Sequence, residues 1–156
     1  MSDLAGNPYA SIVELSKAYR NKSVSPSEVT KAQLARIDDL DTKLGSYQTI
    51  YSDEALAAAK VADEAFTKDS RLGPFHGIPF ALKDIYELKG QITTCGSYEM
   101  RQRISTETGT VVRRLLEAGG IAIGKTKTVE CALGGCLLYT SPSPRDLSTS
   151  RMPSSA

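Results

Sequence analysis

Two short apolar runs with a helical pattern between them constrain the fold of this chain most strongly. Residues 78–82 (IPFAL) form the first run, which ends at Lys83. The helical pattern closes at Gly119-Gly120, and residues 121–124 (IAIG) form the second run. Strand, helix and strand in this order predict a parallel pair of strands joined by a crossover helix. The sequence therefore predicts an α/β fold.

The helical pattern between the two runs has ends and an apolar face that can be placed. Thr106 or Thr108 is expected to open the helix, because both are residue types that cap helix N-termini. The glycine pair is expected to close it. The residues expected to face inward are Val111, Val112, Leu115 and Leu116.

The first third of the chain has the sequence pattern of helices. Ser25, Pro26 and Glu28 match a capping box with proline at the first helical position. Val24 and Val29 match a hydrophobic staple, so a helix is expected to begin after Ser25. The other elements expected here are a helix over residues 10–20, a strand over residues 47–51, and a helix capped by Ser52 with Ala55, Ala59, Ala62 and Phe66 as its apolar stripe.

Charge and hydropathy exclude several classes of protein. Nineteen lysines and arginines against eighteen acidic residues leave a net charge of +1, so no basic surplus favours nucleic acid or an anionic membrane surface. No apolar run approaches the length of a membrane span, and the first residues lack the pattern of a signal peptide. Three cysteines without a Cys-X-X-Cys pair fit a reducing compartment and neither a disulfide framework nor a zinc site. We expect a cytoplasmic protein without metal or cofactor.

The composition of the chain changes sharply at Gly135. Residues 136–156 (CLLYTSPSPRDLSTSRMPSSA) are dense in serine, proline and threonine and have neither the helical nor the strand period. Such a segment cannot bury enough apolar surface to offset the entropy of ordering it, so we expect disorder. The chain is therefore divided into residues 1–135 and a tail over residues 136–156. The tail resembles translated vector sequence, and a natural phosphorylatable tail is the alternative.

Lys83 is the main candidate for chemistry. A surface lysine is solvated and needs no explanation, whereas a lysine buried at a strand end would have a depressed pKa and could act as a base. Asp84 could orient Lys83 or simply end the strand. Residues 93–97 (TTCGS) form a turn or line a pocket beside it. A pair of Lys83 with Ser97 would be a self-contained hydrolase, because a neutral lysine can activate serine.

Two further features are expected to be structural. Residues 119–126 (GGIAIGKT) match the phosphate-binding pattern G-x-x-x-x-G-K-T. That mechanism needs free amides before a helix, but here a helix precedes the motif and its isoleucines favour a strand, whose amides would be committed to the sheet. His76 is the single histidine of the chain and lies in a turn, where a packing role is favoured.

Four blocks of the chain resemble the amidase signature family. They are GPFHGIPFALKD, TTCGS, LLEAGG and IAIGKTKTVECALGG, and the resemblance covers residues 10–135, with Cys131 standing where the family usually carries an aromatic residue. It implies a mixed sheet flanked by helices, and an enzyme that hydrolyses small-molecule amides, or transfers the released ammonia, through a serine, a cis-serine and a lysine. The family's lysine maps onto Lys83, which would be neutral and would accept a proton through the bridging serine.

The resemblance is expected to end at Cys136, before the Gly/Ser-rich segment that carries both serines and the oxyanion loop in the family. We therefore expect an N-terminal fragment of an amidase that is inactive alone, with Lys83 as its one retained catalytic residue. Within the family, the alternative is the amidotransferase subunit that acts on misacylated tRNA. Outside it, the alternatives are a non-enzymatic α/β interaction module with a phosphorylatable tail and, third, a nucleotide-binding protein.

Overall fold

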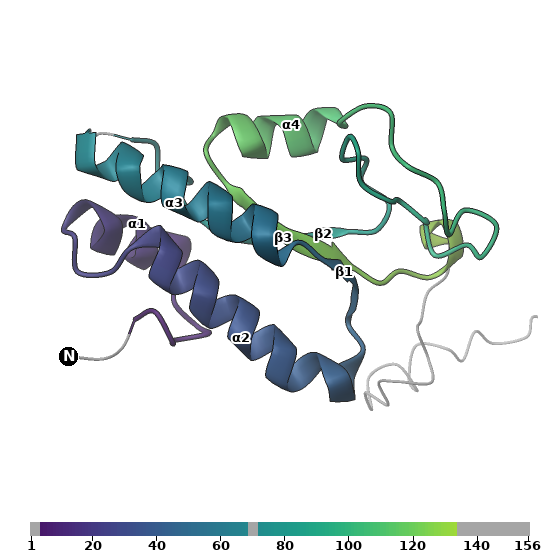
Figure 1. The fold of residues 1–156 in the computed structure, drawn as a ribbon, viewed down its shortest axis with the longest axis horizontal. Coiled ribbons are helices and arrows are strands. Elements are labelled where there is room, and N and C mark those ends of the chain that lie inside the picture. Colours follow the sequence, from purple (N-terminus) through teal and green to yellow (C-terminus); the bar gives the residue numbers. More distant parts are fainter. Residues whose placement is uncertain (1–3, 69–71, 134–156) are drawn as a thin grey trace, which may run out of the picture.

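The fold is an open α/β arrangement in which three strands lie between helices (Figure 1). It was obtained as a computed structural model, which describes residues 4–68 and 72–133. Its elements in chain order are α1 (Ile12–Arg20), α2 (Pro26–Leu44), β1 (Tyr47–Ile50), α3 (Ser52–Lys68), β2 (Pro79–Lys83), α4 (Thr110–Glu117), β3 (Ile121–Thr126) and a single helical turn, η1 (Glu130–Ala132).

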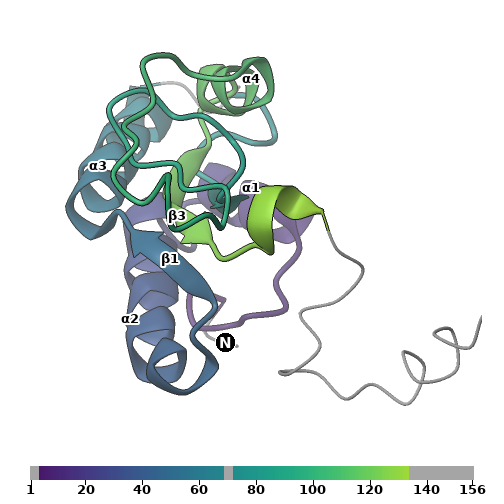
Figure 2. The ribbon, with the colours of Figure 1, turned by 90° about the vertical axis from the view of Figure 1, so that its right-hand side faces the viewer.

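The sheet is mixed, and its central strand is the last in sequence. The strand order is β1-β3-β2, with β2 parallel to β3 and β1 antiparallel to it. Helix α4 connects the parallel pair, and the strands lie between α4 and α2 in both views (Figures 1 and 2). This confirms the predicted α/β fold with a mixed sheet flanked by helices.

Helix α2 begins where its predicted cap places it, whereas Ser52, expected to cap the next helix, is the first residue of α3. Ser25 accepts a hydrogen bond from the Glu28 amide while the Glu28 carboxylate accepts from the Ser25 amide, so the capping box is complete. Ser11 and Glu14 form a second capping box, which begins α1 and which the sequence analysis did not single out. The predicted stripe of α3 is buried in full. Its three alanines pack with Ile121 and Ile123 of β3 and with Ile37, whereas Phe66 packs in a second core cluster with Tyr19 and Val29.

The start of α4 and its inward face differ from the prediction. The N-cap is Gly109 rather than Thr106 or Thr108. The Thr108 hydroxyl instead accepts a hydrogen bond from the amide of Lys89, so it is committed to the preceding loop. Of the four residues expected to face inward, Val112 is buried, Leu115 is half-buried, and Val111 and Leu116 are exposed.

The predicted tail over residues 136–156 lies outside the described residues. Within the described part of the chain, none of the helices has both the length and the apolar character that crossing a membrane requires.

Candidate functional site

Lys83 lies at the end of β2, as predicted, but its side chain is exposed rather than buried. The reason is that β2 is an edge strand with one covered face: Leu82 and Asp84 are buried, whereas Ala81 and Lys83 face outward. The expectation of burial treated the whole apolar run as interior. The predicted position of Lys83 at the strand end is confirmed, whereas the predicted burial of its ammonium is wrong.

The buried lysine of the sheet is Lys125 on β3, whose side chain has 0% relative exposure. Lys125 is the register partner of Leu82, so it points to the covered face, while Lys83 partners Thr126 and points to the opposite face. The sequence does contain a signal for this burial. Lys125 follows Ile121 and Ile123 at every second position, so the three side chains are expected on the same face of the strand. Our sequence analysis considered this lysine only as part of a phosphate-binding pattern.

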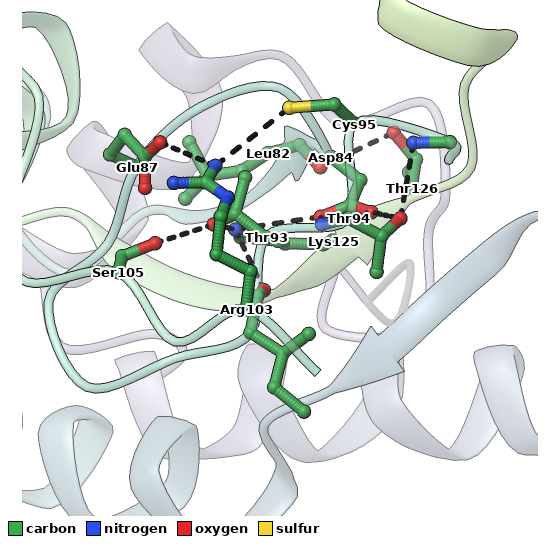
Figure 3. Close-up of polar contacts among 12 residues, drawn as sticks. Leu82, Asp84, Glu87, Thr93, Thr94, Cys95, Arg103, Ser105, Lys125 and Thr126 are labelled. Carbon is green, nitrogen blue, oxygen red and sulfur yellow. Dashed lines mark hydrogen bonds and ion pairs between the residues drawn. The ribbon is translucent and has the colours of Figure 1, made fainter. Parts of the chain in front are cut away.

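The Lys125 ammonium is held by three acceptors (Figure 3). Its Nζ lies 3.5 Å from Oδ1 of Asp84 and donates hydrogen bonds to the carbonyl of Ile92, at 3.0 Å, and to Oγ1 of Thr93. An ammonium has three N–H donors, so each finds a partner. Burial lowers the pKa of Lys125, and the charge of Asp84 acts in the opposite direction. The pair is therefore a satisfied buried ion pair.

Asp84 ties the loop of residues 93–97 to the end of β2. Its carboxylate accepts hydrogen bonds from the amide of Thr94, at 3.1 Å, and from the Thr94 hydroxyl. Its backbone carbonyl accepts from the amide of Cys95 at 2.9 Å. The loop therefore lies beside the strand end, as predicted. The loop is anchored by Asp84, which in turn pairs with Lys125, and Lys83 takes no part in this anchor.

A second layer of polar contacts surrounds this anchor (Figure 3). Thr93 and Ser105 share a buried hydroxyl–hydroxyl hydrogen bond of 2.7 Å, and Arg103 forms a 2.6 Å ion pair with Glu87. Burial by itself would raise the pKa of Glu87, but hydrogen bonds from Ser105 and Arg103 outweigh it and lower the pKa below its usual value. The sequence analysis missed this layer, because its members are far apart in sequence.

A hollow of about 390 Å³, lined mostly by polar and charged residue types, opens beside the loop. Asp84 follows the last residue of β2, and Lys127 and Thr128 follow the last residue of β3, so the hollow lies at the carboxyl ends of the parallel strands. This is where open α/β sheets bind their ligands. Ser97 also lines it, but its hydroxyl donates to Oε1 of Glu130 at 2.8 Å, which does not support the pair with Lys83.

The nucleotide-binding alternative is contradicted by the strand. Residues 121–126 of the pattern form β3, which is paired on both sides, and the pattern's lysine is the buried Lys125. Neither the amides nor the ammonium is available to a phosphate. Among the described residues, no cluster of side chains suited to a metal ion is present either.

His76 packs as a structural residue, as expected. Its ring meets the Phe66 ring edge-on, with 5.4 Å between centroids, and a methyl group added at Gly119 would come within 2.1 Å of its Nδ1. Burial lowers the pKa of His76. These contacts favour a neutral imidazole that fills space between α3 and the turn before β3.

Comparison with known proteins relates most of the chain to amide-hydrolysing enzymes. The family model described as Amidase matches residues 28–144. A glutamyl-tRNA(Gln) amidotransferase subunit of Geobacter sulfurreducens is 43% identical over 121 residues, which are 78% of this chain and 25% of that protein. The corresponding protein of Acidothermus cellulolyticus, which has the same name, is 38% identical over 134 residues, or 86% of this chain and 26% of that protein.

Solved structures of related enzymes share the fold. The native peptide amidase from Stenotrophomonas maltophilia matches with a TM-score of 0.71 and 32% identity, over 79% of this chain and 26% of that one. An amidase family protein from Bacillus anthracis matches with a TM-score of 0.72 and 27% identity, over 79% and 25%. The chain thus spans about a quarter of the length of the relatives it matches.

Proposed function

Because the chain belongs to the amidase signature family, we propose that it forms the N-terminal part of an enzyme that hydrolyses carbon–nitrogen amide bonds. The observation that carries the proposal is the family match over residues 28–144, which includes both parallel strands and the hollow at their carboxyl ends. A hollow of about 390 Å³ lies within the usual size range of sites for small molecules.

Lys83 is the proposed catalytic base. Its side chain is exposed at the end of β2, so its ammonium is accessible to a serine brought by another segment. Asp84, the next residue, is fixed by Lys125 and Thr94, which holds the backbone of Lys83 in place while its side chain stays uncommitted. Covering by that other segment would desolvate the amine and favour its neutral form, which can accept a proton through a bridging serine.

The serines and the oxyanion loop have no candidate among the described residues, so the chain alone is proposed to be inactive. Ser97 is the hydroxyl that the sequence suggested as a partner of Lys83, but it donates its hydrogen bond to Glu130. A lysine without a positioned nucleophile cannot form the covalent intermediate. Losing one member of such a unit costs on the order of 10⁴-fold or more in rate.

The experiment is a chimera in which residues 28–133 replace the matching segment of the Geobacter sulfurreducens relative. Ammonia release from a panel of aromatic and aliphatic amides is measured for the chimera and for the 156-residue chain alone. We expect release from the chimera only. Lys83→Ala in the chimera is expected to lower the rate on the order of 10⁴-fold or more, whereas Lys89→Ala, at another exposed lysine, leaves it unchanged. A chimera whose rate survives Lys83→Ala would refute the assignment.

A second candidate function is the glutaminase part of a tRNA-dependent amidotransferase. The observation that favours it is the name shared by both curated relatives described above, at 43% and 38% identity. A second chimera separates the two candidates, because most of each chimera comes from its host: residues 28–133 also replace the matching segment of the Stenotrophomonas maltophilia peptide amidase. Activity restored only in the Geobacter sulfurreducens relative would support the amidotransferase, whereas activity restored only in the peptide amidase would support a general amidase.

A further inference from the structure

Cys95 and Cys131 lie on two segments that are joined by a backbone hydrogen bond. The amide of Cys131 donates a hydrogen bond to the carbonyl of Cys95 at 2.7 Å. Two residues further along the loop, the Ser97 hydroxyl donates a hydrogen bond to the carboxylate of Glu130. Between them Gly96 is so close to the other segment that an added methyl group would come within 2.7 Å of the carbonyl oxygen of Thr128. The η1 turn is thus attached to the loop at three consecutive points.

This contact places the two cysteines within disulfide range. With the amide of Cys131 2.7 Å from the carbonyl oxygen of Cys95, standard bond lengths limit their Cα–Cα separation to at most about 6.6 Å. Disulfides span Cα–Cα separations of roughly 4.4–6.8 Å. Both are free thiols in this structure, Cys131 exposed and Cys95 half-buried, so an oxidant in solution can reach the pair.

We propose that Cys95 and Cys131 form a reversible disulfide when the chain meets an oxidised small-molecule disulfide such as oxidised glutathione. The exposed Cys131 thiolate attacks one sulfur of the glutathione disulfide, forms a mixed disulfide and releases one glutathione thiolate. The Cys95 thiolate then attacks the Cys131 sulfur and releases the second. Two protein thiols are oxidised, one glutathione disulfide is reduced, and the two protons pass to the two glutathione thiolates.

Cys95 must turn to complete this step. Its sulfur now faces Arg103 and accepts a weak hydrogen bond from Nη2 at 3.9 Å (Figure 3). Rotation about the Cα–Cβ bond moves the sulfur between staggered positions without moving the backbone. The disulfide then pins the loop to η1, and both segments contribute residues to the polar hollow, Gly96 and Ser97 from the loop and Thr128 beside η1. The inference is independent of the proposed amide hydrolysis.

The test uses the full chain and its three single variants, Cys95→Ser, Cys131→Ser and Cys136→Ser, equilibrated in glutathione buffers of increasing oxidised fraction. Free thiols are counted by alkylation and intact mass, with each protein measured folded and in concentrated urea. We expect wild type and Cys136→Ser to lose two thiols together, with the folded chain showing an effective thiol concentration at least about tenfold above that of the urea-unfolded chain. Cys95→Ser and Cys131→Ser are expected to form only mixed disulfides with glutathione.

Three results would overturn the proposal. One is loss of the internal disulfide in Cys136→Ser, which would make Cys136 the partner. Another is an effective thiol concentration no higher in the folded chain than in urea, which would show that the fold does not bring the pair together. The third is accumulation of mixed disulfides in the wild type without any internal bond.

Discussion

Replacing Lys125 by methionine tests the buried ion pair at the centre of the site. Methionine keeps an unbranched side chain, one atom shorter, but removes the ammonium that contacts Asp84, Ile92 and Thr93. Removing one partner of a buried pair leaves an uncompensated charge and costs about 3–5 kcal/mol. Asp84 would retain both hydrogen bonds from Thr94, and Thr93 would retain Ser105, so we expect the lower end of this range, about 3 kcal/mol.

The assay is equilibrium unfolding in urea followed by circular dichroism. Lys127→Met is the matched control, because Lys127 is two residues along the same segment and exposed, and it is expected to change the free energy of unfolding by less than about 0.5 kcal/mol. The double variant Asp84→Asn/Lys125→Met removes both charges and is expected to recover part of the loss, and it supplies the measurement if the single variant does not fold. If Lys125→Met lowers the free energy of unfolding by less than about 1 kcal/mol, the argument that Lys125 compensates the buried charge of Asp84 is refuted.

Three further changes test other parts of the structure. Ser25→Ala removes the side-chain acceptor of a complete capping box and is expected to lower the free energy of unfolding by about 1 kcal/mol in the same urea assay, and an unchanged midpoint would contradict this. Gly96→Ala places a methyl group against the carbonyl of Thr128 at a left-handed φ of 72°, so amide exchange in the loop is expected to accelerate, whereas Gly73→Ala, with open space around it, leaves exchange unchanged. Burial raises the pKa of Tyr51 to about 12, so the folded chain keeps this proton after the unfolded chain has lost it, and the free energy of unfolding is expected to fall as the pH rises from about 10 towards 12. Tyr51→Phe is expected to reduce that slope, and a slope unaffected by the substitution would show that Tyr51 is not its source.

Local signals predicted the elements well, because each is set by residues adjacent in sequence. The Ser25 capping box and the alanine stripe of α3 are of this kind. The burial of a lysine is not, because it depends on strand order. Lys83 and Lys125 each end a short apolar run, and only the placement of β3 between β1 and β2 makes one exposed and the other buried. The contacts around the Asp84–Lys125 pair could not be predicted for the same reason, since Ile92 and Thr93 reach Lys125, and Thr94 reaches Asp84, through the fold.

The position of β3 at the centre of the sheet also governs how the chain can fold during synthesis. Both β1 and β2 pair with β3, which ends at Thr126, so neither has its sheet partner until that strand is available. A growing chain can form its first three helices early, because their contacts are local, but the sheet must wait for pairings between distant parts of the chain. Until then, two strands with unpaired edges are exposed to other chains in the cell. We expect this protein to depend on chaperones most at the stage just before residues 121–126 emerge from the ribosome.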